Sequence, residues 1–94
     1  MHFEWDSRKN ATNHRKHGIF FEEAVTVFLD PSARIFDDPD HSSDEVREII
    51  VGHSVRLRIL IVCFTEREEK VRIISARVAT KRERISHEQK TSTS

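Results

Sequence analysis

The longest apolar run in the chain is LRILIVCF, residues 57–64, which only Arg58 interrupts. Its hydrophobic residues are continuous and do not alternate with polar ones, as is typical of a strand that is covered on both faces or nearly so. The run is also rich in β-branched and aromatic residues, which favour a strand over a helix of the same length. We therefore expect residues 57–64 to form the central strand of a sheet.

The segment that follows this run predicts a hairpin and a helix. A charged connection, residues 65–70, returns the chain into a second apolar run at residues 71–76, although it lacks the glycine that would fix a tight turn. Beyond this run, Thr80 is a candidate N-cap, and Glu83 stands three residues later, as in a capping box. A short basic helix is therefore predicted to begin after Thr80.

Upstream of the central strand, the chain predicts two helices and three further strands. A polar surface helix is expected at residues 6–17, and a second helix at residues 20–29 has an apolar stripe that would cover one face of the sheet. The further strands are expected at residues 2–5, 33–36 and 46–52. This order predicts an α+β domain with a mainly antiparallel sheet, two N-terminal helices and a short C-terminal helix.

The length and composition predict one small domain. Ninety-four residues suffice for one modest core, which we place at residues 1–89, with a disordered tail at residues 90–94. The single cysteine, Cys63, excludes an intramolecular disulfide and indicates a reducing cytoplasm, and its apolar surroundings favour a core residue over a nucleophile. No apolar run approaches the about 18 residues of a membrane span, and no signal peptide is recognisable. We therefore expect a soluble, cytoplasmic protein.

The formal net charge of zero hides a separation of charge along the chain. Residues 37–48 contain six acidic residues and only one basic residue, whereas residues 70–84 contain six basic residues and only one acidic residue. Such asymmetry can place a cationic face on a neutral molecule, and that face is a candidate for binding phosphate. The alternative is that both runs are simply solvated surface.

Two sets of residues resemble metal ligands. Asp37, Asp38, Asp40 and His41 lie within five residues of one another, but hard-cation loops space their oxygen ligands more regularly. His14 and His17 are one helical turn apart, but no third ligand is evident. We therefore expect no metal ion and no cofactor.

Several short motifs follow one another in an order that is specific in combination. They are FEWD at residue 3, KHG at residue 16, FEEA at residue 21, DPDH at residue 38, TER at residue 65 and IISAR at residue 73. Over about residues 3–88 the chain resembles the BrnT toxins. One departure is Glu68-Glu69, which replaces a small or glycine-containing turn.

The resemblance implies a RelE-like fold and a ribonuclease activity that inhibits translation. It also implies neutralisation by a BrnA-type antitoxin, a small ribbon-helix-helix protein. Because this antitoxin binds DNA, the toxin would meet DNA only through its partner. No membrane is implied.

Metal-independent cleavage of RNA requires three kinds of group. A base takes the 2′-OH proton, cations hold the charge of the phosphorane, and an acid or strong cation meets the leaving 5′ oxygen. The candidate catalytic residues are His17, Lys16, Glu66, Arg67 and Arg77. His17 has an ordinary pKa near neutrality and is the favoured proton carrier, although a histidine at a helix end can also simply bond free carbonyls.

Two of the other catalytic candidates, Glu66 and Arg77, also allow two interpretations. Glu66 is either a base or an ion-pair partner of Arg67 or Lys70. Arg77 follows a strand at a cationic junction with few acids nearby, so we favour phosphate binding over a surface ion pair. The candidate RNA-binding residues are Arg72, Lys81, Arg82 and Arg84.

A second function remains open. The chain can instead be a binding module without catalysis, whose basic face holds nucleic acid or an acidic protein. Phe20, Phe28 and their apolar neighbours would then seat another chain.

Overall fold

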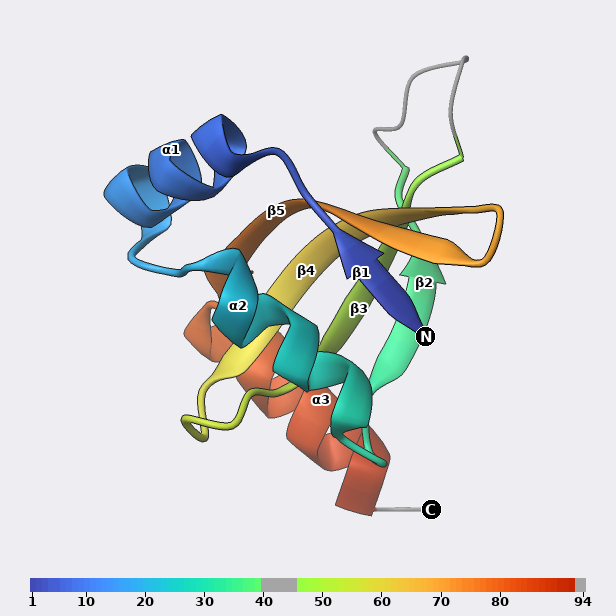
Figure 1. Ribbon diagram of the computed structural model, residues 1–94. Coiled ribbons are helices and arrows are strands. Elements are labelled where there is room, and N and C mark those ends of the chain that lie inside the picture. The colour runs from blue at the N-terminus through green and yellow to red at the C-terminus, as the bar shows by residue number, and fades with distance from the viewer. Residues whose placement is uncertain (40–45, 93–94) are drawn as a thin grey trace.

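The computed structural model describes residues 1–39 and 46–92. Among these residues, five strands form one mixed sheet with the order β1-β5-β4-β3-β2 (Figure 1). The strands are β1 (His2–Glu4), β2 (Arg34–Asp37), β3 (Glu48–His53), β4 (Ile59–Arg67) and β5 (Lys70–Val78). Neighbouring strands run antiparallel, except that β1 pairs with β5 in parallel. The long apolar run therefore supplies the central strand, β4, as its composition predicts.

Helices lie on both faces of the sheet. The helix α1 (Ser7–His17), the short helix α2 (Phe21–Ala24) and the 3-10 helix η1 (Val25–Leu29) precede β2, and α3 (Lys81–Ser92) follows β5. The pair α2 and η1 covers one face, and α3 lies against the other (Figure 1). The chain is thus an α+β domain. The single helix predicted at residues 20–29 is instead an α-helical turn that tightens into a 3-10 helix.

The β4–β5 hairpin is tighter than the sequence predicts. Arg67 pairs with Lys70, so the turn contains only Glu68 and Glu69, whose φ angles are 53° and 67°. Two central residues with positive φ are typical of a type I′ turn, which matches the twist of the flanking strands. The six-residue connection predicted at 65–70 is therefore wrong, because two glutamates adopt a conformation that usually calls for glycine or asparagine.

The main core lies between the sheet and the α2–η1 side. Its largest fully buried side chains are Ile19, Phe21, Val27, Leu60, Val62, Val71 and Ile73. Phe28 adds edge-to-face contacts with Phe3 and Phe64, with ring centroids 5.0 Å apart in both pairs. Phe28 is therefore partly buried and packs against the core, whereas Phe20 remains 48% exposed.

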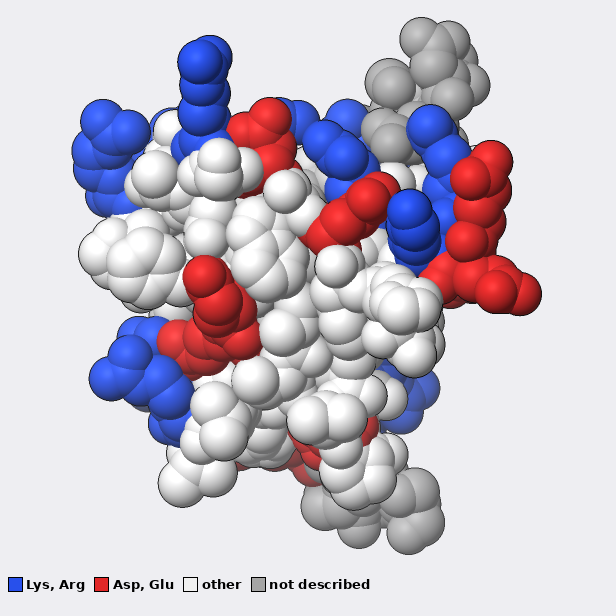
Figure 2. Space-filling view, viewed as in Figure 1, with Lys and Arg blue, Asp and Glu red and all other residues white. Residues whose placement is uncertain are grey.

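On the face that α2 and η1 cover, lysine and arginine side chains lie mainly at the margins. Figure 2 shows lysine and arginine side chains over α1 and around the β4–β5 hairpin, while the centre is mostly uncharged.

Within residues 1–39 and 46–92, no helix has both the length and the apolar character needed to cross a membrane.

The opposite face of the sheet is only partly covered. Val51, Ile59 and Ala79 form a small second cluster near α3, while Ile61 remains partly exposed beside it. Cys63 points to this face and is half-buried, with its Sγ 3.4 Å from Asp38 Oδ2. The central strand is thus fully covered only on the α2 side, and Cys63 does not join the main core as its apolar neighbours predicted.

The amide of Asn13 fastens α1 to β5. The buried Asn13 Nδ2 donates to the carbonyls of Ala76 (2.8 Å) and Ile19 (2.9 Å), and Asn13 Oδ1 accepts from Ala76 N (3.1 Å). The helix begins at the N-cap Asp6 and ends at Gly18 in the left-handed region, with φ 73°. These contacts hold the last turn of α1 beside the middle of β5.

The helix α3 begins as predicted and ends later. Thr80 N donates to Glu83 Oε1 (2.8 Å) and Glu83 N donates to Thr80 Oγ1 (3.2 Å), which is the reciprocal pattern of a capping box. The helix then continues to Ser92, through the start of the range predicted as a disordered tail. Lys90 Nζ lies 5.8 Å from the centre of the Phe36 ring, a cation–π contact that ties the end of α3 to β2. Residues 93–94 lie outside the described part of the chain.

Candidate functional site

Three adjoining hollows lie along the sheet face that carries α3. The first (about 270 Å³) lies between α1 and β5, the second (about 420 Å³) over β3, β4 and β5, and the third (about 430 Å³) between the sheet and α3. His17 and Ser75 line both the first and the second, and Ile61 and Arg77 line both the second and the third. We call these three adjoining hollows, which share lining residues, the groove.

Among the described residues, lysines and arginines outnumber carboxylates in the walls of the groove. Among the described residues, the lysines and arginines that line it are Arg8, Lys9, Lys16, Arg34, Arg47, Arg77, Arg82 and Lys90. The carboxylates that line it are Asp37, Asp38 and Glu83. Its floor is apolar where Ile49, Val51 and Ile61 meet. This combination of a charged wall and an apolar floor suits a polyanion that carries flat bases.

The groove brings together three of the five predicted catalytic residues. His17, at the end of α1, and Arg77, on β5, line the same hollow, and Lys16 lines the adjoining one. A β-bulge contributes to this arrangement, because the pairing of β4 with β5 shifts between Cys63 and Phe64. The shift leaves Ile74 as an extra residue, and both Ile74 and Ser75 line the groove.

Glu66 and Arg67 lie elsewhere. They occupy the exposed end of the β4–β5 hairpin and line none of the three hollows. Glu66 pairs with Val71, six residues before Arg77 along β5, so the two sites are about 20 Å apart at the usual rise of a strand. A single phosphate cannot contact both sites. We grouped Glu66 and Arg67 with the other catalytic candidates because the sequence predicts a loop at the positions where β4 in fact continues.

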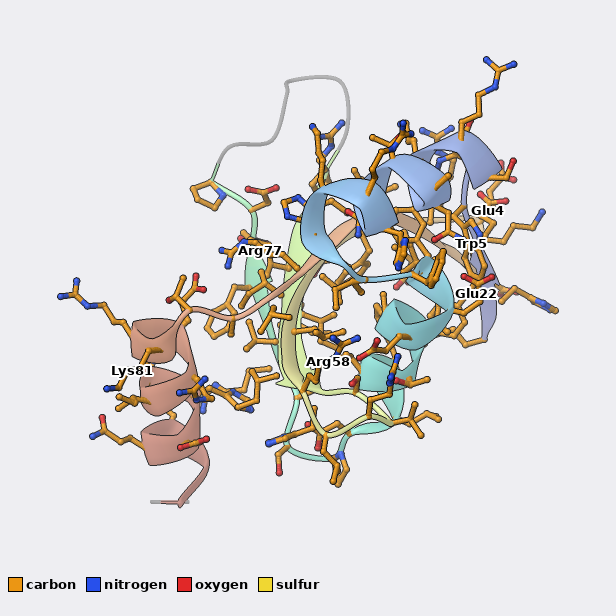
Figure 3. The ribbon with its side chains drawn as sticks, turned by 90° about the vertical axis from the view of Figure 1, so that its left-hand side faces the viewer. Glu4, Trp5, Glu22, Arg58, Arg77 and Lys81 are labelled. Atoms are coloured by element: carbon orange, nitrogen blue, oxygen red, sulfur yellow. The ribbon has the colours of Figure 1, made fainter. Side chains whose placement is uncertain are left out.

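Arg77 is paired with an acid. Its Nη1 and Nη2 donate to Glu83 Oε1 (2.8 Å) and Oε2 (2.9 Å) in a two-point ion pair. The Arg77 guanidinium, helped by the Thr80 amide, lowers the pKa of Glu83 to about 2, and Glu83 in turn raises the pKa of Arg77. The ion pair that the sequence left open as the alternative for Arg77 is therefore present, and its partner is Glu83, the one acid of residues 70–84. Figure 3 shows Arg77 on the side of the sheet that carries α3, opposite Trp5 and Glu22.

The four predicted RNA-binding residues are dispersed. Arg82 lines the groove, whereas Arg84 lines a separate hollow beside α3. Lys81 lies on the outer side of α3, away from the sheet (Figure 3). Arg72 approaches Glu4, with Nη1 3.8 Å from Oε1, and lines none of the three hollows of the groove. A helix turns by about 100° per residue, so consecutive basic residues on α3 cannot share one face.

Several residues that line the groove were not among the site residues predicted from the sequence. Arg47 lines the groove with His17 and Arg77, although it is the one basic residue of the acidic stretch 37–48. Strand alternation offered a signal, because Arg47 precedes Ile49 by two residues and both line the same hollow. Arg34 on β2 had no comparable signal, since its place depends on how the sheet is ordered.

The side chains that resembled metal ligands in the sequence differ in where the structure places them. Asp40 and His41 lie outside the described residues. His14 stacks on Phe20, with ring centroids 3.8 Å apart and planes at 5°. Among the described residues, one group has ligand atoms close enough to hold a metal ion, namely Asp30, His53 and His87.

Comparison with known proteins identifies the family. The family model for the ribonuclease toxin BrnT of type II toxin–antitoxin systems matches residues 5–83. The crystal structure of the Brucella abortus ribonuclease toxin BrnT has 30% sequence identity to this chain and a TM-score of 0.66, and the match covers 86% of this chain and 99% of that one. A comparison with curated protein sequences found no match. The chain therefore belongs to the BrnT family of ribonuclease toxins of type II toxin–antitoxin systems.

Proposed function

We propose that this toxin cleaves RNA bound in the groove by metal-independent acid–base chemistry. The observation that carries the proposal is the meeting of His17, Lys16 and Arg77 along one cationic groove in a chain of a ribonuclease family. The groove runs from α1 to α3, so an RNA strand lying in it would meet cations along its backbone. Arg82 is the member of the predicted RNA-binding set best placed to hold that strand.

The proposed reaction proceeds within the RNA strand. His17 takes the proton of a 2′-OH, the 2′ oxygen attacks the adjacent phosphorus, and a 2′,3′-cyclic phosphate forms as the bond to the 5′ oxygen breaks. Arg77 and Lys16 stabilise the extra negative charge of the phosphorane. The departing 5′ oxygen takes up a proton from water or from the imidazolium of His17.

Glu83 positions Arg77 in this scheme. A carboxylate that binds both terminal nitrogens fixes the plane of the guanidinium before RNA arrives. The guanidinium has five N–H groups, so others remain to donate to a phosphate. In this reading Glu66, Arg67, Arg72, Lys81 and Arg84 act outside the reacting phosphate, as contacts to flanking nucleotides or to a protein partner.

We further propose the finer properties that the resemblance implies. They are a RelE-like fold, residence in the cytoplasm, and neutralisation by a BrnA-type ribbon-helix-helix antitoxin that alone contacts DNA. Exposed apolar side chains support a protein partner, since Phe20 is 48% exposed and Leu29 is 83% exposed. The partner is tested by co-expression. An antitoxin gene product that neither copurifies with the toxin nor restores cell growth contradicts this part of the proposal.

Purified protein and end-labelled RNA in excess EDTA test the chemistry. We expect fragments that end in cyclic phosphate, with a rate that chelation leaves unchanged. Activity that disappears with EDTA and returns with a divalent ion, while circular dichroism and the melting temperature stay unchanged, would show that metal supplies the chemistry.

The same experiment separates the toxin from a binding module. A binding module would shift labelled RNA on a gel and produce no fragments. His17→Gln supplies the control, because it removes the proposed proton carrier and keeps the cations of the groove.

A further inference from the structure

Three metal-ligating side chains from distant parts of the chain lie close together, and one of them, His87, also lines the third hollow of the groove. Asp30 follows η1, His53 ends β3, and His87 lies in α3. One ligand atom from each lies within 4.8 Å of the other two. His53 Nδ1 is already 3.3 Å from Asp30 Oδ2, and the rings of His53 and His87 are 6.0 Å apart between centroids.

His87 is the unusual member of this cluster. Only 4% of the residue is exposed, and its Nε2 is buried without a hydrogen-bond partner among the described residues. Buried polar atoms nearly always have a partner, so this nitrogen is available to bind a ligand.

The carboxylate of Asp30 is held in place for coordination. Its Oδ1 accepts from Ser32 N (2.9 Å) and its Oδ2 accepts from His53 N (2.7 Å). Gly52 makes this position possible, because a Cβ at residue 52 would lie 2.9 Å from Asp30 Oδ2. The hydrogen bonds that orient Asp30 are of the kind that commonly supports metal ligands from behind.

We propose that Asp30, His53 and His87 form a binding site for Zn²⁺ or a similar divalent transition metal. Two imidazole nitrogens and one carboxylate oxygen are donors that zinc accepts, and three protein ligands leave one position for water. Tetrahedral zinc with bonds of about 2.0–2.2 Å separates its ligand atoms by about 3.4 Å. The distance of 3.3 Å between His53 Nδ1 and Asp30 Oδ2 already fits this ligand separation, so only His87 must move closer.

The site would fasten α3 to the rest of the domain. Asp30 and His53 belong to the body of the protein, whereas His87 belongs to the helix that forms one wall of the groove. Besides Asp30 and His53, the charged residues that act on His87 are Arg34 and Glu88, which have opposite charges. Bound metal would therefore stabilise the position of α3 without taking part in the chemistry at His17 and Arg77.

Zinc binding to the untagged, full-length protein tests this proposal. Metal is first removed by chelation, and the protein is then dialysed against ZnCl2 and followed by metal analysis and thermal melting. We expect one equivalent of zinc and a higher melting temperature, because binding to the folded state alone stabilises it. Co²⁺ in place of zinc should give the visible absorption of a four-coordinate site. A protein that takes up no zinc at micromolar concentrations overturns the proposal.

Matched variants locate the metal. His53→Gln changes an exposed ligand and should weaken zinc binding by more than about tenfold, while the metal-free protein stays folded. His87→Gln should have the same effect on zinc. His14→Gln is the control, because it removes the other closely spaced histidine pair, His14 and His17. Unchanged binding in His53→Gln, or binding lost in His14→Gln, would place the metal elsewhere.

Discussion

The guanidinium of Arg77 and the carboxylate of Glu83 form a two-point ion pair that joins β5 to the first turn of α3, with N–O distances of 2.8 and 2.9 Å. Glu83 also accepts a hydrogen bond from the amide of Thr80, so one carboxylate both caps the helix and orients the arginine. The start of α3 and the proposed phosphate-binding group are therefore positioned by the same side chain. This coupling leads to the first two predictions.

Arg77→Ala should lower the rate of RNA cleavage by about 10² to 10³, which is the usual loss when one donor to transition-state charge is removed. Arg77→Lys is the sharper comparison, since it keeps the charge and loses the planar fork. We expect the lysine variant to be impaired as well. Single-turnover cleavage is the measurement, with folding checked by circular dichroism.

The exposed Arg15 on α1 provides the control for this prediction, because it carries the same charge and lines none of the three hollows of the groove. Arg15→Ala should cleave RNA at close to the normal rate. A folded Arg77→Ala protein with full activity would remove Arg77 from the site, and full activity in Arg77→Lys would show that simple charge is enough.

Glu83→Gln should change how stability depends on pH. The pKa of Glu83 falls from 4.5 to about 2 in the folded protein. A lowered carboxylate pKa means that this stabilisation is present above pH 4.5 and is lost as the pH falls toward 2. Urea denaturation at pH 7, 4.5 and 2.5 gives the free energy of unfolding at each pH. As the pH falls from 7 to 2.5, the glutamine variant should lose less of this free energy than the unchanged protein. Parallel curves for the two proteins would contradict the ion pair, and Glu69→Gln in the exposed hairpin turn is the matched control.

Local signals in the sequence identified much of this fold. The apolar run gives the central strand, Gly18 ends α1, and Thr80 with Glu83 begins α3, because each feature depends on neighbours a few residues apart. The prediction for the hairpin turn was wrong because its conformation does not follow from the local residues. Glu68 and Glu69 have little intrinsic preference for positive φ, and the strands on either side impose it.

The site was harder to predict because it depends on the order of the strands. Arg47 lines the same hollow as His17 only because β3 lies beside β4 and α1 packs on β5. Arg77 and Glu83 are six residues apart across the junction between a strand and a helix, where no simple periodicity applies. Residue type indicated phosphate chemistry, but it could not show which cations share one surface.

Asn13 should be essential for placing His17. Asn13→Ala would leave the amide and carbonyl of Ala76 and the carbonyl of Ile19 without their partners in a buried site. We expect a loss of about 2–4 kcal/mol in the free energy of unfolding, since each buried group without a partner costs about 1–3 kcal/mol and some will recover water. Urea denaturation measures this loss. As a control, Ser7→Ala on the exposed start of α1 should change the free energy of unfolding by less than about 0.5 kcal/mol. A loss below about 1 kcal/mol for Asn13→Ala would show that α1 is held by other contacts.

Gly52→Ala should act on both stability and zinc binding. The added methyl group would lie 2.9 Å from Ala33 Cβ and from Asp30 Oδ2, closer than packed atoms tolerate, so the carboxylate must move. Overpacking of this kind typically costs about 1–3 kcal/mol, and the displaced Asp30 should bind zinc more weakly. Gly18→Ala is the informative comparison, because it strains a residue with φ 73° at the end of α1, far along the chain from Asp30. Both variants should melt earlier than the unchanged protein, yet only Gly52→Ala should lose zinc affinity in equilibrium dialysis. Equal zinc affinity in the two variants would mean that Asp30 is not a ligand.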